Sequence, residues 1–583
     1  MFRNLFHLKK YFVRYKKSFM LGIVFILFSN FGQVYIPQLV KQGINVIDSG
    51  VDDGSVLKFV ILIVITSLIA GIFRFLIRQT IIVTSWKIAN DLRYDFWGHL
   101  QKLPLRFYQN NSTGNIMSHA TNDINAVRSF VGPSVMYTID NGTKFLLVFI
   151  IMVSMNPLLT LYALLPSPFM SLVVYLVMSR VHAKYTRIQE KFADLTARAQ
   201  ENFSGIRVVK SYIREEYEID NYKKESDEYL NRKMDLVKLQ AMFIPVFSII
   251  AGLSFIIVLW AGGSQMIEGN FTIGELVAFY AYLGMLIWPM ISFGWVATMI
   301  QQAEASMKRL MKIFNEPYEI DDSPKTDNAI ADIKGEIEFK NVSFRYGGNL
   351  PLVLDGISFK IEQGRTVAFI GQTGTGKTSL VNLIPRFYDA TDGEIFIDGI
   401  DIKRIPLETI RRRIGMVPQE NFLFSDTLGN NVVYGLDKSD PERIRIASEI
   451  AQLSKDVENF PKGFETILGE RGITLSGGQK QRSSLARALA IDPKILILDD
   501  SLSAVDTNTE EEILKRLKVF MKNRTSIIIS HRISTVKDSD KILVLHNGKI
   551  AEEGTHEELV ALKGIYADLH RRQLLEEELS VME

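Results

Sequence analysis

Long apolar runs are concentrated in the first half of the chain, and each is long enough to cross a bilayer. A membrane-spanning helix needs about 20 mostly apolar residues. The pattern predicts such helices over six segments: residues 18–40, 56–77, 133–154, 158–179, 241–263 and 273–300. One such run can be a buried helix of a large soluble protein, whereas a series of them is typical of a membrane domain. We therefore expect a domain of six long transmembrane helices over residues 18–310.

The segments that flank these spans differ in basic residues, and this difference predicts the orientation. Lys and Arg are frequent in residues 1–17 and 180–198. The loops on the opposite side of the predicted membrane, near residues 41–55, 153–157 and 264–272, hold a single basic residue, Lys41. Because cytoplasmic loops carry an excess of Lys and Arg, both termini are expected in the cytoplasm. Residues 1–17 also mix aromatic and basic side chains, as an interfacial helix does.

Two segments between spans, residues 78–132 and 180–240, are long, charged and helix-compatible. We expect membrane helices to continue through them into the cytoplasm and to turn there, with short transverse helices near 110–117 and 204–220. Ordinary solvated loops are the alternative, unless a partner domain is available for contact.

The second half of the chain supplies such a domain. Residues 311–335 are polar and include Pro317 and Pro324, as a linker would. The alternating segment GEIEFKNVSFRY then predicts a strand, and residues 336–575 continue as an α/β pattern with a tail at 576–583.

A phosphate-binding loop is the clearest motif of this half. An apolar strand ends at Gly371, the pattern GxxxxGK[ST] runs to Thr378, and a helical pattern follows at once. Its glycines let backbone N–H groups face phosphate oxygens, Lys377 reaches the β and γ phosphates, and the Thr378 hydroxyl binds Mg²⁺. The predicted ATP-binding residues of the loop are Gly371, Gln372, Thr373, Gly374, Thr375, Gly376, Lys377, Thr378 and Ser379.

A second apolar strand, residues 495–499, ends in two adjacent aspartates. Asp499 is the predicted carboxylate ligand of Mg²⁺. In sites of this type the next residue is usually a glutamate that activates water, and here it is Asp500. Together the two strands indicate a P-loop nucleotide hydrolase.

The segment LSGGQ, Leu475–Gln479, narrows the class. With it, residues 336–575 resemble the nucleotide-binding domain of an ABC transporter, and essentially the whole chain resembles an ABC exporter half-transporter of bacterial multidrug exporters. The resemblance implies two nucleotides sandwiched between two such domains, each held by one chain's phosphate loop and the other chain's LSGGQ segment. It therefore implies a second half-transporter as partner, with ATP and Mg²⁺ as cofactors.

The resemblance also assigns roles to single residues. It implies that Tyr346 stacks on adenine, that Gln419 contacts Mg²⁺ and the attacking water, and that His531 is a switch histidine on the γ phosphate. The resemblance also implies that the LSGGQ segment contacts the partner's ATP through Leu475, Ser476, Gly477, Gly478 and Gln479. Further implied positions are a loop at the dimer interface (Ser503, Ala504, Asp506) and a loop contacting the membrane domain (Glu470, Arg471).

Asp500 leaves three interpretations open. It can be a slow but adequate base in a homodimer, an engineered change, or the mark of the degenerate half of a heterodimeric exporter. The neighbouring DDSLSAVD, in place of the usual DEATSALD, resembles the degenerate half, and the resemblance favours this third interpretation. His531 is a departure, since degenerate halves often lose that histidine, so the impairment would rest on Asp500.

Composition excludes several other classes. The chain of 583 residues contains no Cys, which excludes disulfides, thiolate metal sites and a cysteine-protease domain of peptidase-type exporters. The net charge of +2 argues against nucleic acid as a partner. A lipid or peptide exporter stays open as an alternative, and an ATP-gated channel is poorly excluded by sequence.

Cargo is the least determined property. Aromatic side chains such as Trp288 and Trp295 together suit an adaptable apolar cavity for small hydrophobic substrates, although packing or lipid contact is the favoured explanation for any single one. Asp140 lies inside the third predicted span, where a charge usually faces a cavity or a partner. Either it pairs with Lys144, four residues on, or it lines the cavity and attracts cationic substrates.

Overall fold

The computed structural model describes residues 4–50, 53–348, 350–469, 472 and 475–582. It divides into two compact units, which are described one by one. The first contains residues 1–99 and 114–315, and the second contains residues 100–113 and 316–583. The predicted combination of a helical membrane domain and an α/β nucleotide-binding domain is confirmed.

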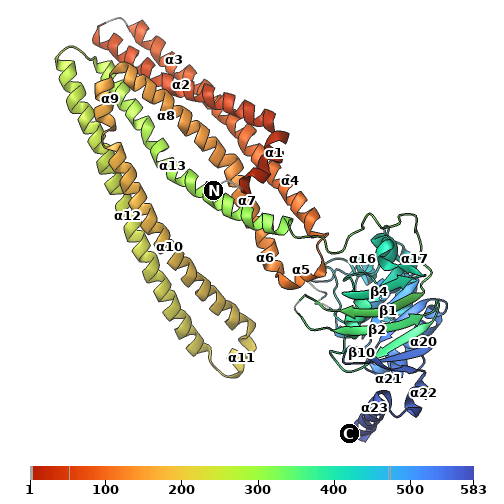
Figure 1. The fold of residues 1–583 in the computed structure, drawn as a ribbon. Coiled ribbons are helices and arrows are strands. Elements are labelled where there is room, and N and C mark those ends of the chain that lie inside the picture. Colours follow the sequence, from red (N-terminus) through yellow and green to blue (C-terminus); the bar gives the residue numbers. More distant parts are fainter. Residues whose placement is uncertain (1–3, 51–52, 349, 470–471, 473–474, 583) are drawn as a thin grey trace. The chain divides into compact units, whose positions relative to one another are not determined.

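The described part of the first unit is helical throughout (Figure 1). A short 3₁₀ turn at Asn4–Leu8 leads into its helices, which are α1 (Lys9–Arg14), α2 (Lys16–Asp48), α3 (Asp53–Ile77), α4 (Val83–Leu100), α6 (Thr113–Ser118), α7 (Ile124–Ser129), α8 (Val135–Met155), α9 (Pro157–Leu164), α10 (Ser167–Ser204), α11 (Ile206–Ser211), α12 (Glu215–Ile267) and α13 (Ile273–Phe314). Single π-helical turns at Arg78–Ile82, His119–Asp123 and Phe130–Ser134 join α3 to α4 and α6 to α8 without a break.

Among the described residues, five continuous helices are long and apolar enough to cross a membrane, namely Lys16–Asp48, Gly54–Leu100, Thr113–Met155, Glu215–Ile267 and Ile273–Phe314. They contain five of the six predicted spans. The predicted span at 158–179 is divided between α9 and α10 by a turn at residues 165–166, where Pro166 interrupts the helix.

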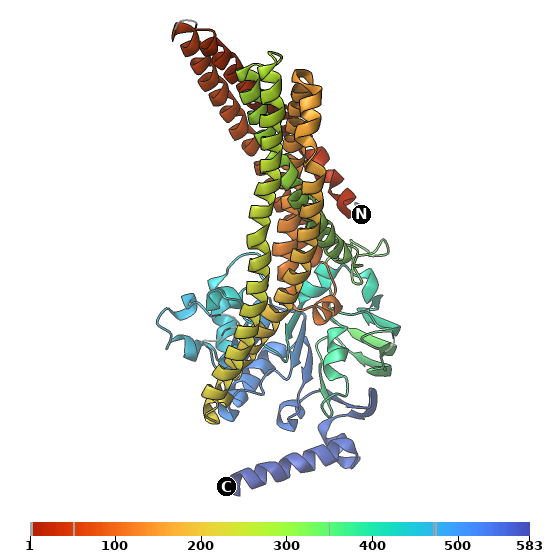
Figure 2. The same ribbon diagram turned by 90° about the vertical axis from the view of Figure 1, so that its left-hand side faces the viewer.

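The helices extend well beyond the predicted spans, because polar contacts hold their charged ends. Figure 2 shows α10 and α12 running side by side as a long pair, and Lys191 of α10 contacts Glu225 and Glu228 of α12. The pair turns at α11, inside the predicted region 204–220. In the N-terminal segment, Lys10 Nζ lies 2.7 Å from Asp95 of α4, so this segment is fixed to the helical unit.

The described residues of the second unit form two sheets. A four-stranded antiparallel sheet has the order β2–β1–β4–β5, and a six-stranded sheet has the order β10–β9–β3–β8–β7–β6. All pairings in the larger sheet are parallel except that of the edge strand β10. The strands are β1 (Ile337–Phe344), β2 (Leu354–Ile361), β3 (Thr366–Ile370), β4 (Asp392–Ile397), β5 (Ile400–Asp401), β6 (Ile414–Val417), β7 (Ile495–Asp499), β8 (Thr525–Ile529), β9 (Lys541–His546) and β10 (Lys549–Gly554).

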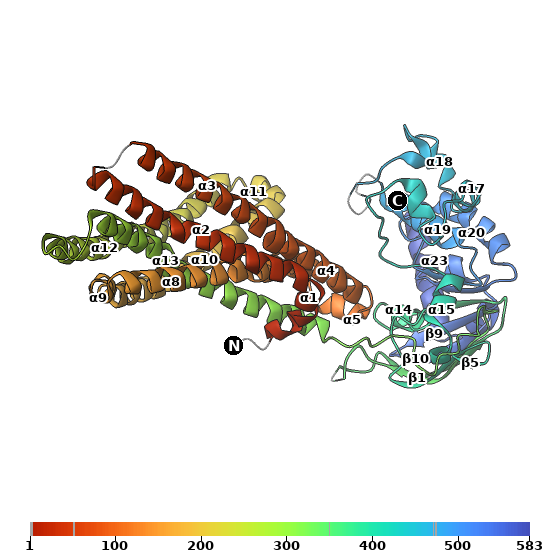
Figure 3. The ribbon, with the colours of Figure 1, turned by 90° about the horizontal axis from the view of Figure 1, so that it is seen from above.

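Helices pack against these sheets, and Figure 3 shows α17 and α18 toward the opposite end of this unit from β1 and β5. The helices are α5 (Leu105–Asn110), α14 (Lys377–Asn382), α15 (Leu407–Arg413), α16 (Leu428–Val432), α17 (Pro441–Ile450), α18 (Ser454–Val457), α19 (Gly477–Ala490), α20 (Thr507–Met521), α21 (Ile533–Val536), α22 (His556–Ala561) and α23 (Ile565–Met582). The helix α5 ends at Asn110, so the first transverse helix precedes the turn predicted at 110–117.

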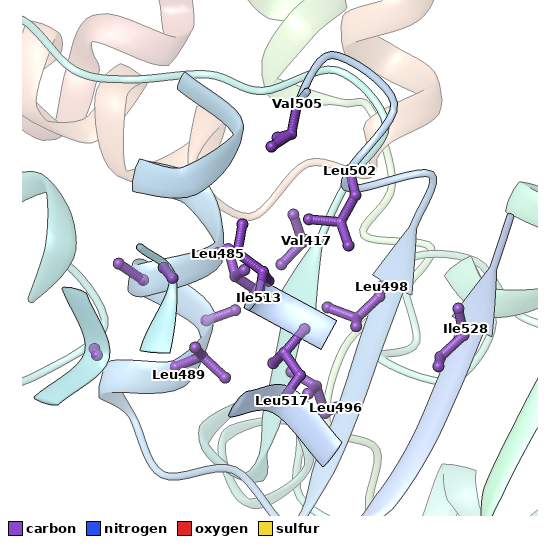
Figure 4. Close-up of a cluster of buried hydrophobic side chains, with 14 of the residues drawn as sticks. Val417, Leu485, Leu489, Leu496, Leu498, Leu502, Val505, Ile513, Leu517 and Ile528 are labelled. Carbon is purple, nitrogen blue, oxygen red and sulfur yellow. The ribbon is translucent and has the colours of Figure 1, made fainter. Parts of the chain in front are cut away.

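Apolar strands and one face of each helix form the core of this unit. Figure 4 shows Leu496 and Leu498 of β7 packed with Leu485 of α19 and Ile513 of α20. All four are buried, with at most 2% of their surface exposed. Burial of side chains this size contributes about 2 kcal/mol each, so the strand that ends in Asp499 is rigidly held.

Candidate functional site

Four sequence motifs meet at one edge of the larger sheet. The strands β3, β8, β7 and β6 are parallel neighbours in that order. The loop 371–378 follows β3, His531 follows β8, Asp499 and Asp500 end β7, and Gln419 follows β6. Because ligands of open α/β sheets bind at the carboxyl ends of the strands, this arrangement gathers the predicted nucleotide-contacting groups into one site.

The loop after β3 depends on glycine at two positions. A Cβ added to Gly371 would lie 2.3 Å from the carbonyl oxygen of Leu545, and one added to Gly376 would lie 2.9 Å from that of Val353. Gly376 also has a φ of +98°, in the left-handed region that favours glycine. The loop therefore packs closely against its neighbours and exposes backbone N–H groups at the start of α14, a geometry suited to anions.

Lys377 is buried at the base of this loop. Its ammonium donates to the carbonyl oxygens of Gly371 (2.8 Å) and Gln372 (2.9 Å). Burial lowers the pKa of Lys377, while the nearby carboxylates of Asp499 and Asp500 oppose that shift. The site thus holds one cation near two carboxylates, so a phosphate that binds here requires a divalent metal ion to offset the added negative charge.

Asp499 offers a group suited to a hard metal ion. Its side chain is 1% exposed, and its Oδ2 has no hydrogen-bond partner. Burial raises the pKa of this carboxyl group, although a hydrogen bond with the Thr378 side chain opposes the shift. A carboxylate and a hydroxyl in contact are ligands that Mg²⁺ accepts, so these two residues fit the predicted metal. Among the residues that the structure describes, no group of three or more His, Cys, Asp or Glu side chains is placed to hold a metal ion.

Asp500 has an unusual backbone conformation for a residue that is not glycine. Its φ is +49°, its N–H donates to the carbonyl oxygen of Ile529 (2.9 Å), and its own carbonyl accepts from the Ser503 hydroxyl (3.1 Å). Asp and Asn populate this left-handed region more readily than most residues. The position is fixed by two backbone hydrogen bonds, so the reach of the side chain decides where its carboxylate lies.

Asp500 and His531 line a common cavity of about 100 Å³. The residue after the histidine, Arg532, contacts the buried carboxylate of Glu510 on α20. The loop that contains His531 is therefore anchored to the core through the following residue, Arg532.

Tyr346, predicted to stack on adenine, lies beside the phosphate loop. Its hydroxyl is hydrogen-bonded to that of Ser379 in α14 (2.8 Å), and its ring meets Tyr388 edge-on with centroids 5.3 Å apart. Tyr388 in turn accepts a hydrogen bond from the Gln109 amide of α5 (2.9 Å). Sequence patterns did not single out Tyr388 or Gln109, since the contact joins residues 279 positions apart.

The LSGGQ segment opens α19, as expected from its sequence. Ser476 is the N-cap: its hydroxyl accepts from the Gln479 N–H (3.3 Å), and the Gln479 side chain accepts from the Ser476 N–H (3.0 Å). Leu475 is buried and anchors the segment to the core. Gly477 and Gly478 form the first turn, whose N–H groups give the positive end of the helix.

The loop 503–506 is linked to α19 by a residue that the sequence patterns did not identify. Gln481 donates to the Ser503 hydroxyl (3.0 Å) and accepts from the Ala504 N–H (2.9 Å). Asp506 caps α20, because its carboxylate accepts from the Thr509 N–H (3.0 Å). The hydrogen bonds of that N–H and of the Thr509 side chain lower the pKa of Asp506. The helix α19, which the LSGGQ segment opens, is thus hydrogen-bonded to the loop after β7 through the side chain of Gln481.

The structure gives fewer contacts for the remaining predicted site residues. Within the phosphate loop, the Thr375 hydroxyl donates to the carbonyl of Gln372 (2.9 Å), and Thr373 and Gly374 complete the turn. Gln419 is exposed at its strand end. Glu470 and Arg471, predicted to contact the membrane domain, lie outside the described residues.

In the membrane unit, Asp140 and Lys144 of α8 lie 3.6 Å apart with 17% and 9% of their side chains exposed. This contact agrees with the interpretation of a structural pair. The Trp295 ring of α13 lies 5.2 Å from that of Tyr137 on α8 and is 49% exposed. Trp288 is 56% exposed.

Two family descriptions match this chain in the order of its two units. "ABC transporter transmembrane region" matches residues 19–290, and "ABC transporter" matches residues 354–503. Among solved structures, the chain is similar to a bacterial Atm1-family ABC exporter with ATP bound. The TM-score is 0.81 at 26% identity, over 96% of this chain and 98% of the other.

Full-length relatives give the same result. The chain is 35% identical to the probable multidrug resistance ABC transporter ATP-binding/permease protein YheI of Bacillus subtilis, over 99% of this chain and 98% of that one. A putative multidrug export ATP-binding/permease protein of Staphylococcus aureus is 37% identical, with 84% of this chain and 85% of that one covered. The ATP-dependent lipid A-core flippase of Desulfotalea psychrophila is 36% identical, with 83% and 84% covered.

The membrane helices, the nucleotide site at the sheet edge and the LSGGQ helix therefore occur together in one chain, and its named relatives cover 83% to 99% of its length. On this evidence the protein belongs to the ABC transporter family, as an exporter half-transporter whose ATPase domain is fused to its membrane domain.

Proposed function

We propose that this chain exports hydrophobic or amphiphilic compounds as one half of a heterodimeric multidrug exporter, and that its own ATP site hydrolyses slowly. Asp500 at the end of β7 is the observation that carries the proposal. The names of the Bacillus and Staphylococcus relatives support the cargo class. Alternating access driven by ATP-dependent closure of two nucleotide-binding domains is the mechanism expected of this architecture.

In the proposed site, Tyr346 stacks on adenine, and the N–H groups of residues 371–379 hold the phosphates. Lys377 leaves its present carbonyl partners to contact the β and γ phosphates, which match its charge better. Thr378, Gln419 and Asp499 would hold Mg²⁺, which neutralises phosphate charge when it is bound. His531 contacts the γ phosphate from the neighbouring strand.

The slow hydrolysis proposed for this site follows from the length of the Asp500 side chain. A general base must lie within hydrogen-bond distance of its water, and the backbone of Asp500 is fixed by its hydrogen bond to Ile529. A carboxylate one methylene shorter than that of glutamate falls short by about 1 Å, and such a displacement can lower the rate by about 100-fold. The site on this chain then holds ATP for longer than a site with glutamate.

The LSGGQ segment of this chain has no corresponding defect. Ser476 caps α19 and Leu475 is buried, so the segment is preformed. We infer that it completes the partner's site, whose glutamate supplies the working base, with Ser503, Ala504 and Asp506 at the dimer interface. One site retains ATP and keeps the domains engaged, while the other hydrolyses it.

The bacterial cytoplasmic membrane is the proposed location, with both termini in the cytoplasm. The names of the relatives are those of bacterial exporters, and the basic residues that flank the first span support the orientation. Lys10 and Arg14 lie in the N-terminal segment, where they pair with acidic residues of α4.

A lipid exporter is the second candidate, because one relative is a lipid A-core flippase. The assay that separates the candidates is uptake into inverted vesicles with a panel of cationic dyes, neutral dyes and a fluorescent lipid. Dye transport with no lipid movement supports the multidrug proposal, and lipid movement alone overturns it.

The heterodimer is tested by ATPase activity of the chain purified alone and after co-expression with candidate partner half-transporters. We expect low activity alone and a large increase with the partner. Strong activity of the chain alone would contradict the proposal and favour a homodimer with an adequate Asp base.

Gly371→Ala is expected to abolish ATP binding by this chain. Its Cβ would lie 2.3 Å from the Leu545 carbonyl oxygen, a backbone atom that has little freedom to move. Equilibrium binding of a fluorescent ATP analogue to the purified chain measures the effect. Gly374→Ala is the matched control, since nothing lies within 4 Å of its added Cβ although its φ is +86°. Binding by Gly371→Ala comparable to that of this control would contradict the assignment of the loop.

Exchanging Asp140 and Lys144 is expected to preserve export of cationic dyes. The two side chains form a largely buried pair, which the exchange keeps. Asp140→Asn leaves Lys144 unpaired, so export of cationic and neutral dyes should fall together as the protein is destabilised. If the exchange and Asp140→Asn both reduce cationic export while neutral export survives, Asp140 is a substrate ligand instead.

A further inference from the structure

The C-terminal helix α23 contacts the loop that carries His531 through one amide side chain. The Gln573 Oε1 accepts from the backbone N–H of Ile533 (2.8 Å), and its Nε2 donates to the backbone carbonyl of His531. The two backbone groups belong to residues on either side of Arg532. One side chain therefore fixes both the position and the direction of the switch loop.

A second element holds the same loop from another direction. Glu510 of α20 is 5% exposed, contacts Arg532 and accepts a hydrogen bond from the Thr535 hydroxyl (3.0 Å). The Ser530 hydroxyl accepts from the Arg532 N–H (3.0 Å). These contacts fix the residues around His531, whereas the His531 carbonyl itself is held by Gln573.

The first residues of α23 are attached to the rest of the unit independently of Gln573. The N–H groups of Ile565 and Tyr566 donate to the carboxylate of Glu552 on β10. Tyr566 is fully buried, and its hydroxyl is hydrogen-bonded to the His556 ring (2.7 Å). Because these contacts do not involve Gln573, the helix should stay attached when that side chain is changed.

We propose that Gln573 is a positioning residue for His531, so that the C-terminal helix is part of the device that distinguishes ATP from ADP. This inference rests on the proposed role of His531 at the γ phosphate. Fixing the histidine backbone sets where the imidazole can reach, and a γ-phosphate contact depends on that reach. ADP lacks the γ phosphate, so its binding should be insensitive to the same side chain.

Photolabelling of this chain with radiolabelled 8-azido-ATP and Mg²⁺, in membranes of cells that express it, tests the proposal without a purified partner. Competition by unlabelled ATP and by unlabelled ADP gives the two affinities. For Gln573→Ala we expect the preference for ATP over ADP to fall by about 5- to 10-fold, through loss of ATP affinity alone. Unchanged ADP competition shows that the site stays folded.

Two further variants sharpen the test. Gln573→Glu keeps the shape and the acceptor for Ile533 but cannot donate to the His531 carbonyl, so it should lose the preference as Gln573→Ala does. Arg572→Ala is the matched control, because it removes a surface ion pair with Asp568 (2.8 Å) on the same helix. It should leave the preference unchanged.

A double-mutant cycle with His531→Ala decides between positioning and general structure. If Gln573 acts through His531, then Gln573→Ala has no further effect in the His531→Ala background. Additive losses, or a normal preference in Gln573→Ala while His531→Ala loses it, would overturn the inference. If His531→Ala itself keeps the preference, the proposed role of His531 fails instead.

Discussion

Replacing Asp500 by Glu is expected to raise ATP hydrolysis at the site of this chain by about 10- to 100-fold. The added methylene should move the carboxylate toward the attacking water, which we propose lies beyond the reach of Asp500. The φ of +49° works against the change, because Glu tolerates the left-handed region less well than Asp. That conformation costs about 1–2 kcal/mol of folding free energy, which lowers the stability of the variant but leaves the longer reach of its carboxylate unchanged.

The measurement is the steady-state rate of phosphate release at saturating MgATP by the transporter assembled from this chain and a partner whose catalytic glutamate is replaced by Gln, so that only the site of this chain contributes. Asp500→Asn is the control of matched shape and backbone preference, and it should lower the remaining activity further. Equal rates for the wild type and Asp500→Glu would show that the length of this side chain does not limit hydrolysis, and the account of a slow site would then be wrong.

Ser476→Arg is expected to abolish ATP turnover of the assembled transporter. It removes the N-cap of α19, which costs about 1 kcal/mol, and it places a long cationic side chain where the helix end should meet the partner's phosphate. The change acts on the partner's site. Asp500→Asn, which acts on the slow site of this chain, should therefore reduce turnover of the assembly without abolishing it.

Comparison of the two variants in the same purified transporter checks this asymmetry. ATP binding to the phosphate loop of this chain should survive Ser476→Arg, which controls for folding. Substantial turnover in Ser476→Arg, or equal loss in both variants, would show that the LSGGQ segment of this chain does not complete the working site.

The nucleotide site was predictable because its motifs are local. A strand, a glycine loop and a helix are contiguous around Lys377, and the structure has β3 and α14 there. The end of β7 at Asp499 was predictable for the same reason. Four apolar residues before a carboxylate favour a buried parallel strand.

The contacts between distant segments were not predictable from one sequence. Gln109 meets Tyr388 across 279 positions, and Gln573 meets the His531 loop across 40 or more. A glutamine carries no hydrophobic period or motif that would mark such a role. The left-handed conformation of Asp500 was not predictable either, because it accompanies a hydrogen bond to Ile529 of β8 that only the fold creates.

The membrane unit follows hydropathy closely except at the fourth predicted span. Hydropathy records which segments are apolar, whereas the division into α9 and α10 arises from a proline whose effect depends on local packing. Hydropathy also leaves cargo undetermined, since Trp288 and Trp295 are apolar whether they meet substrate or lipid. Sequence spacing favoured the pairing of Asp140 with Lys144 only slightly over a cavity role, and the contact itself is seen only in the structure.

The central claim is that the site of this chain retains ATP while the partner's site hydrolyses it. The most direct measurement labels the transporter, purified through a tag on this chain, with 8-azido-ATP carrying radioactivity at either the α or the γ phosphate. After turnover, crosslinking and electrophoresis report on each chain separately. We predict that this chain keeps the γ label while its partner keeps only the α label. Loss of the γ label from this chain as fast as the transporter turns over would contradict the account.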